Sequence, residues 1–122
     1  MSDKEKIQAV VKKIVDKIQP EKVILFGSHA WGKATEDSDA DLLVIQRSQE
    51  QRLDRVFKIR RAIFPTGIAV DIISYTPEEL ERAINEHQNL FLEDIVRNGR
   101  ELYSKSNFDI KISRGPVEVL KV

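Results

Sequence analysis

The sequence predicts a mixed α/β domain in which a small mixed sheet is flanked by helices. Three short apolar runs rich in β-branched residues, 23–26, 42–45 and 68–73, have the length and composition of buried strands. Two longer stretches, 4–19 and 50–64, place apolar residues at helical spacing before and between these strands. The 122 residues are enough for one domain with a buried core, but too few for a separate substrate domain beside a catalytic one.

The first two helices follow from apolar spacing and from prolines. In residues 4–19 the apolar side chains share one helical face, and Pro20 ends the helix. Residues 50–64 show mainly helical offsets, and the Pro-Thr-Gly segment 65–67 supplies the turn into the third strand. A helix therefore precedes the first strand and another joins the second strand to the third.

Two further helices are expected towards the C-terminus. Thr76, which a proline follows, and Glu79 have the pattern of an N-cap with a partial capping box, which predicts a helix that continues through Ile84. A last helical run around residues 91–96 stops at Gly99, which follows an asparagine and is typical of a helix C-terminus.

Residues 105–122 are expected to extend a minimal domain of residues 1–104. Apolar and polar residues alternate from Phe108 to Ile112, and a Ser-Arg-Gly-Pro segment then breaks the run. The pattern fits a small hairpin, an additional edge strand, a partly disordered tail, or an arm that adds to the sheet edge of a partner.

Three aspartates are the candidate metal ligands and catalytic residues. Asp39 and Asp41 open the second strand, where alternate positions point the same way, so both carboxylates are expected on one face. Asp71 lies inside the third apolar run, where an ionised carboxylate requires a cation or a solvent-filled cleft. Together they offer the all-oxygen ligands that Mg²⁺ prefers.

A Gly-Ser pair at the end of the first strand is the candidate phosphate-binding element. Gly27 allows close backbone approach, and Ser28 is expected to cap a short helix through Ala30 and Trp31. Exposed N–H groups at a helix start attract phosphate. The strand, the Gly-Ser turn and the paired aspartates therefore predict a phosphate cradle that faces a metal site, an arrangement suited to a metal-bound nucleoside triphosphate.

The spacing of these residues carries a resemblance to a known family. The Gly-Ser pair is followed by ten residues and then by Asp-x-Asp, with a third aspartate in a later strand. This pattern resembles the minimal nucleotidyltransferases, the single-domain branch of the DNA polymerase β-like superfamily. The resemblance implies the polymerase β-like fold, two Mg²⁺ ions held by Asp39, Asp41 and Asp71, and a triphosphate whose β- and γ-phosphates contact Gly27 and Ser28. Asp71 would complete the acceptor-side ion and take the proton of the acceptor.

The same resemblance implies a donor and a partner. Minimal members are often encoded beside a HEPN-type ribonuclease toxin, and several act as antitoxins that adenylylate a tyrosine of that toxin. We therefore expect ATP as donor, a protein hydroxyl as acceptor, and a hetero-oligomer with a HEPN-type toxin. The alternative is a non-catalytic binding module that neutralises a toxin stoichiometrically. A third interpretation, that Arg82 and His87 form the Arg-x4-His pattern of a HEPN ribonuclease, conflicts with the predicted strands.

One position departs from the family pattern, because Trp31 stands where many members have arginine. Tryptophan cannot supply a cation to the triphosphate, so Lys33 is a candidate substitute. Trp31 itself is expected to stack on a base or to pack in the core. His29 is interpreted as a surface residue or a phosphate contact.

Charge and composition bear on nucleic-acid binding and on cellular location. Lys plus Arg and Asp plus Glu are equal at 20 each, so no bulk positive field favours nucleic acid, and the basic residues of 47–61 are interpreted as the solvated face of a helix. Cysteine is absent, which agrees with a reducing compartment. The charged N-terminus lacks an apolar signal core and no stretch suits a membrane span, so a cytoplasmic location is expected.

Overall fold

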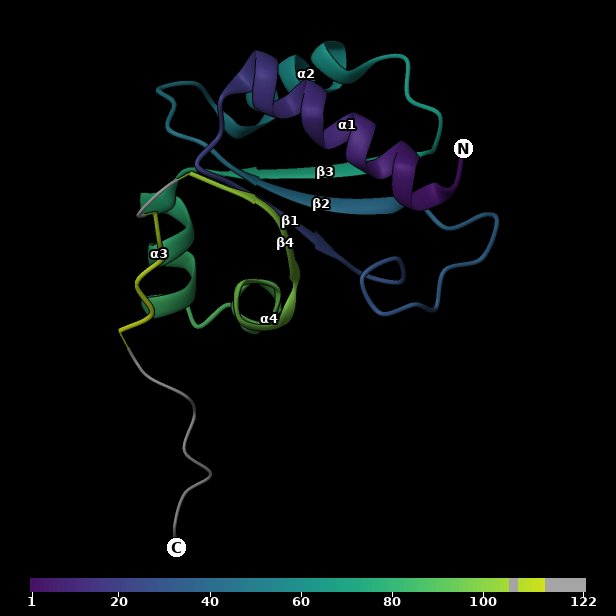
Figure 1. Cartoon of the computed structure of the whole chain (residues 1–122). Helices are drawn as coiled ribbons and strands as arrows, with labels where there is room; N and C mark the ends of the chain where they lie inside the picture. Colours follow the sequence, from purple (N-terminus) through teal and green to yellow (C-terminus); the bar gives the residue numbers. More distant parts are fainter. Residues whose placement is uncertain (106–107, 114–122) are drawn as a thin grey trace, which may run out of the picture.

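The computed structural model describes residues 1–105 and 108–113, and it confirms the predicted mixed α/β fold. Its elements are α1 (Asp3–Ile18), β1 (Lys22–Phe26), β2 (Ala40–Ile45), α2 (Arg52–Ile63), β3 (Val70–Tyr75), α3 (Pro77–Asn85), α4 (Leu90–Asn98) and β4 (Arg100–Ser104). Within these residues, four strands form a mixed sheet in the order β3-β2-β1-β4. β2 and β3 are parallel, and β1 is antiparallel to both of its neighbours. Helices α1 and α2 cover one face of the sheet, and α3 and α4 cover the other (Figure 1).

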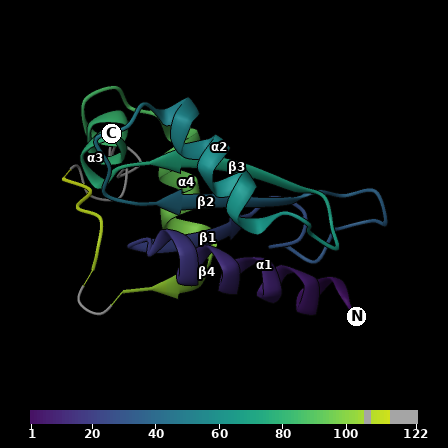
Figure 2. The same ribbon diagram turned by 90° about the horizontal axis from the view of Figure 1, so that it is seen from above.

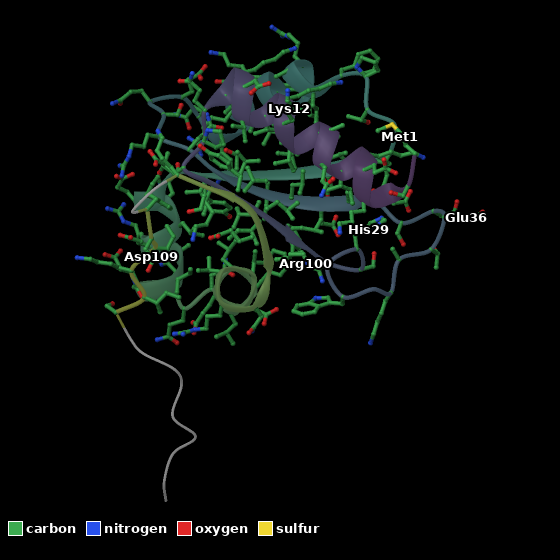
Figure 3. All side chains as sticks on the ribbon, in the orientation of Figure 1. Met1, Lys12, His29, Glu36, Arg100 and Asp109 are labelled. Atoms are coloured by element: carbon green, nitrogen blue, oxygen red, sulfur yellow. The ribbon has the colours of Figure 1, made fainter. Side chains whose placement is uncertain are left out.

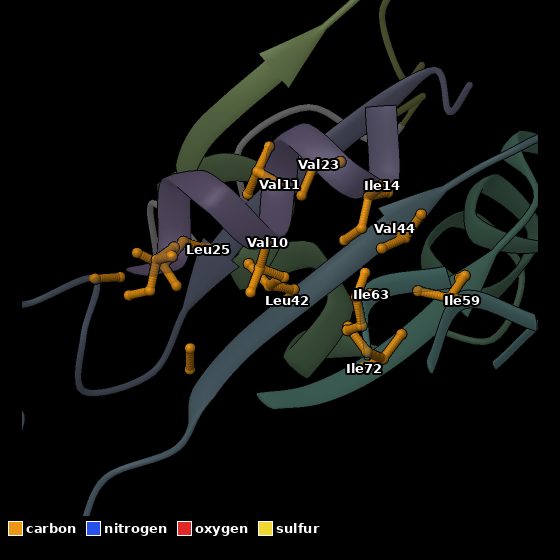
Figure 4. Close-up of a cluster of buried hydrophobic side chains, with 13 residues drawn as sticks. Val10, Val11, Ile14, Val23, Leu25, Leu42, Val44, Ile59, Ile63 and Ile72 are labelled. Atoms are coloured by element: carbon orange, nitrogen blue, oxygen red, sulfur yellow. The ribbon is translucent and has the colours of Figure 1, made fainter. Parts of the chain in front are cut away.

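The face under α1 and α2 buries the cluster of apolar side chains that Figure 4 shows. α1 begins with a capping box, in which the hydroxyl of Ser2 accepts a hydrogen bond from the Glu5 N–H and the Glu5 carboxylate accepts one from the Ser2 N–H. It ends at Gln19, whose φ of 55° is left-handed. Its apolar face supplies Ile7, Val10, Val11 and Ile14 to the core. Fully burying each such side chain contributes about 1.5–3 kcal/mol, so packing against the sheet stabilises the helix.

The face under α3 and α4 buries a second cluster. Alternate residues of the same strands reach opposite faces: Val23 and Leu25 of β1 belong to the first cluster, whereas Ile24 belongs to the second. Burial on both faces explains why the strands appear as continuous apolar runs rather than alternating ones. The predicted capping box of α3 is present, because Thr76 Oγ1 accepts from the Glu79 N–H at 3.1 Å.

Two segments differ from the expectations. Residues 100–104 form the edge strand β4, which was not predicted because Leu102 is the only aliphatic side chain in that run. Residues 108–113 form no strand; instead Ile110 is buried in the second cluster, and the Asn85 side chain of α3 donates to the Lys111 carbonyl at 3.0 Å. The remainder of the expected hairpin or arm lies outside the described residues.

The topology places one end of three strands together. β1 ends where β2 begins, because the two are antiparallel, and β3 begins beside β2, because those two are parallel. Figure 2 shows this arrangement from above, with α1 beginning near the same end of the sheet. No helix among the described residues is long and apolar enough to cross a membrane.

Candidate active site

Strand register brings the predicted aspartates to this end of the sheet. Asp41, the second residue of β2, lies opposite Phe26 of β1 and beside Asp71 of β3. Asp39 lies in the loop directly before β2. Asp41 is half-buried, whereas Asp39 is exposed and the side chain of Asp71 is 60% exposed. Asp71, for which a cation or a solvent-filled cleft was expected, is therefore open to solvent on the edge strand β3.

Burial and neighbouring charges both act on the Asp41 carboxyl. Burial raises the pKa of the Asp41 carboxyl above its ordinary value, and the negative charges of Asp71 and Asp39 raise it further. His29 acts in the opposite direction and lowers the pKa of Asp41. Mutual repulsion of this kind favours a bound cation, because a positive charge stabilises all of the carboxylates at once.

His29 connects the Gly-Ser turn to the loop that carries Asp39. Its Nε2 lies 3.0 Å from the carbonyl oxygen of Ser38, which can only accept, so Nε2 donates in this hydrogen bond. The bond joins the turn after β1 to the residue before Asp39. In Figure 3, His29 lies at this end of the sheet and Glu36 marks the outer part of the loop that returns to β2.

The Gly-Ser segment forms a turn and not the expected short helix. The Ala30 N–H donates to the Gly27 carbonyl at 3.0 Å, and the N–H groups of Trp31 and Lys33 both donate to the Ser28 carbonyl. Within residues 1–105 and 108–113, no hydrogen bond engages the N–H of Ser28 or of His29. Both donors are therefore available to a phosphate oxygen, as the cradle requires.

Gly27 is required by its conformation and by its contact with Asp41. Its φ is +74°, a left-handed backbone value that residues with a Cβ rarely adopt. A Cβ at this position would overlap the Oδ2 atom of Asp41. The phosphate turn and the central carboxylate are thus packed directly against each other.

The donor set fits a hard divalent cation such as Mg²⁺, because it consists of carboxylate oxygens. In the part of the chain that the structure describes, no three His, Cys, Asp or Glu side chains are already gathered around a single metal position. Asp71 instead places Oδ1 3.5 Å from Nη2 of Arg60. Because Asp71 is largely exposed, its carboxylate can rotate from Arg60 towards Asp41 without repacking the core.

The basic residues of α2 are not simply a solvated face. Arg55 is the largest fully buried side chain, and its guanidinium donates to the Glu50 carbonyl, to Ser74 and to the carboxylate of Glu79. Arg60 contacts Asp71, as described above. Helical periodicity did not show which residue of the Arg-Arg pair 60–61 faces the site. The buried hydrogen bonds of Arg55 and the contact of Arg60 with Asp71 were therefore not predicted from the sequence.

The remaining sequence candidates are also placed. Trp31 is 55% exposed, so it does not pack in the core, and Lys33 is exposed on the same turn. Arg82 belongs to α3, where its Nε lies 3.4 Å from Glu86 Oε2. His87 follows that helix. The HEPN-like pattern thus spans the end of a helix that covers one face of a β-sheet and the turn after it, which is incompatible with an all-helical ribonuclease fold.

The family model for the polymerase beta nucleotidyltransferase domain matches residues 5–108. The match covers most of the sequence and spans the Gly-Ser turn and all three aspartates. The chain therefore belongs to the polymerase beta nucleotidyltransferase family, as the motif spacing predicted.

Two proteins of Methanocaldococcus jannaschii are similar in sequence. The one named "Putative protein adenylyltransferase MJ1305" is 35% identical over 92 residues, which cover 70% of this chain and 60% of that protein. The one named "Putative protein adenylyltransferase MJ0604" is 31% identical over 101 residues, which cover 82% of this chain and 93% of that protein.

Two solved structures share the fold. A crystal structure described as a "putative nucleotidyltransferase" from Sulfolobus solfataricus superposes with a TM-score of 0.58 at 21% identity, covering 84% of this chain and 81% of that one. A toxin–antitoxin structure with AMP-PNP superposes with a TM-score of 0.50 at 20% identity, covering 86% of this chain and 76% of that one. At these identities the superpositions support the fold assignment alone.

Proposed function

We propose that this nucleotidyltransferase moves AMP from ATP to a hydroxyl group of a partner protein. The observation that carries the proposal is that strand register sets Asp41 beside Asp71, two residues after Asp39, while Gly27 of the Gly-Ser turn packs against the Asp41 carboxylate. The two relatives named as protein adenylyltransferases support AMP as the transferred group and a protein as the acceptor. The AMP-PNP of the toxin–antitoxin structure agrees with an adenine nucleotide as donor.

Each residue of the site would have its own role in the reaction. The N–H groups of Ser28 and His29 would hold the β- and γ-phosphates, while Asp39, Asp41 and Asp71 would hold Mg²⁺ ions. Bound Mg²⁺ neutralises the phosphate charge and favours attack on the α-phosphorus. The acceptor hydroxyl oxygen would form the new P–O bond, the bond to the β-phosphate would break, and pyrophosphate would leave. Asp71, being exposed, would accept the hydroxyl proton.

The proposed partner is a HEPN-type toxin, for which this chain would be the antitoxin. Support comes from the toxin–antitoxin structure that shares the fold and from the motif resemblance. A hetero-oligomer is therefore part of the proposal.

Label transfer from nucleoside triphosphates tests the proposal. The wild-type protein and the Asp41→Asn variant are incubated with Mg²⁺, with α- or γ-labelled ATP, and with a lysate of a host that produces the candidate toxin. We expect the α-label on one protein in the wild-type reaction and none with Asp41→Asn. Transfer of the γ-label alone would indicate a kinase reaction instead. Toxin neutralisation that Asp41→Asn retains in full would favour the stoichiometric binding module.

A further inference from the structure

A pocket with aromatic walls adjoins the phosphate-binding turn. Its volume is about 200 Å³, and its lining residues are Phe26, Gly27, Trp31, Phe91, Asp94, Ile95 and Gly99. It lies between α4 and the turn that follows β1. Because Gly27 also touches the Asp41 carboxylate, a ligand in this pocket would lie next to the candidate active site.

The two aromatic residues at the rim are unusually exposed for their size. Trp31 is 55% exposed and Phe91 is 59% exposed, although both rings are large and apolar. Phe91 is held in place from one side by Phe26, whose ring centroid is 5.7 Å away in an edge-to-face arrangement. Exposed aromatic surface beside a pocket is typical of a site that a planar ligand covers.

The floor of the pocket depends on a close approach of α4 to β1. A Cβ on Gly99 would come within 2.5 Å of both the Ile24 Cγ2 atom and the Ile95 carbonyl oxygen. Gly99 therefore permits the contact that fixes Phe91 and Asp94 relative to the Gly-Ser turn. The walls come from packed elements rather than from one loop.

The position of the pocket favours the donor over the acceptor. Strand order places β3 and Asp71 at one edge of the sheet, with β1 two strands away, or roughly 10 Å across the sheet. Asp71 is the residue proposed for the acceptor side, whereas Gly27 belongs to the proposed phosphate cradle. A ring in the pocket would thus belong to the molecule whose phosphates occupy the Gly-Ser turn.

We propose that this pocket is the nucleobase subsite of the donor, in which Trp31 and Phe91 stack on the base. The inference rests on the proposed function for the identity of the donor as a nucleoside triphosphate. Asp94, at the rim, accepts a hydrogen bond from the Asn98 side chain at 2.8 Å and has further acceptor capacity for the exocyclic amino group of adenine. The tryptophan at position 31 therefore binds the base instead of supplying a cation to the phosphates.

The single tryptophan of the chain makes the subsite directly observable. The full-length protein is titrated with ATP and, separately, with inorganic tripolyphosphate, in Mg²⁺, while tryptophan fluorescence and binding heat are followed. We expect ATP to quench Trp31 emission and tripolyphosphate to bind without quenching. Loss of one base–aromatic stack in Phe91→Ala should weaken ATP binding roughly tenfold and leave tripolyphosphate binding unchanged.

Phe57→Ala is the matched control, because Phe57 is also 59% exposed but lies on α2, over the opposite face of the sheet. It should bind both ligands as the wild type does. The subsite is wrong if neither ligand binds, if ATP does not quench Trp31, or if Phe91→Ala weakens both ligands equally. It is also wrong if Phe91→Ala raises the KM of the acceptor protein and not that of ATP. Base-dependent binding without any transfer would contradict the proposed function and leave the subsite standing.

Discussion

Replacing Gly27 by alanine separates two roles of that residue, its left-handed backbone and its contact with Asp41. The φ of +74° costs a residue with a Cβ about 1–2 kcal/mol. In a domain of this size, that loss lowers Tm by about 4–8 °C. The new Cβ would also occupy the place of the Asp41 Oδ2 atom. Because that atom is the end of a flexible side chain, the fold can tolerate the substitution by rotating the carboxylate away.

Rotation of Asp41 should abolish most of the activity. A displacement of about 1 Å in a reacting group can cost about 100-fold in rate, and here the displaced group is the central carboxylate of the site. We therefore expect Gly27→Ala to lose 100-fold or more in label transfer, a far larger effect than its loss of stability can explain.

Gly32→Ala is the matched control for this experiment. Gly32 has nearly the same φ, +72°, yet a Cβ there would meet nothing within 4 Å. Both variants should lose similar stability in thermal unfolding followed by circular dichroism, but only Gly27→Ala should lose transfer activity at a temperature where both are folded. Equal activities in the two variants would refute the argument that Gly27 is needed to place Asp41.

Two further predictions concern charged residues. Asp41→Asn should raise Tm at pH 7, because folding raises the pKa of Asp41 and so disfavours its ionised form. The difference in Tm from wild type, measured by thermal unfolding across pH, should vanish as the pH falls below 3.8, the ordinary pKa of the group. At pH 7 the difference should shrink when Mg²⁺ is added. A variant less stable than wild type at pH 7 would contradict this sign. Arg55→Ala should cost about 3 kcal/mol in denaturant unfolding, because it leaves a cavity and removes the hydrogen bonds to Ser74 and to the Glu50 carbonyl, and a loss below about 1 kcal/mol would show that the buried guanidinium is not stabilising.

Much of the site could be predicted because its residues are close in the sequence or fixed by strand periodicity. Gly27 and Asp41 lie at the ends of strongly apolar strands, so their positions followed from the strands themselves. The parallel pairing that puts Asp71 beside Asp41 was not predicted, and the motif resemblance implied only that Asp71 belongs to the same metal site. The fold of α1 and α3 was predictable for a similar reason, since apolar spacing and capping residues are local signals.

The features that the sequence did not reveal depend on tertiary packing. β4 is a short polar edge strand, and only its pairing with β1 makes it a strand. The burial of Arg55 depends on acceptors supplied by three other segments, which no local pattern encodes. The aromatic pocket likewise joins Trp31 to Phe91, residues sixty positions apart that a periodicity argument cannot bring together.

Asp39, Asp41 and Asp71 are proposed to form one catalytic centre beside the Gly-Ser turn. The most direct test of this proposal is the rate of α-label transfer from ATP by the wild type and by the three single Asp→Asn variants, each first shown to be folded by circular dichroism. Electrostatic stabilisation by positioned groups is commonly the largest catalytic contribution, so each variant should lose about 100-fold or more. A near wild-type rate in any of the three would contradict the account.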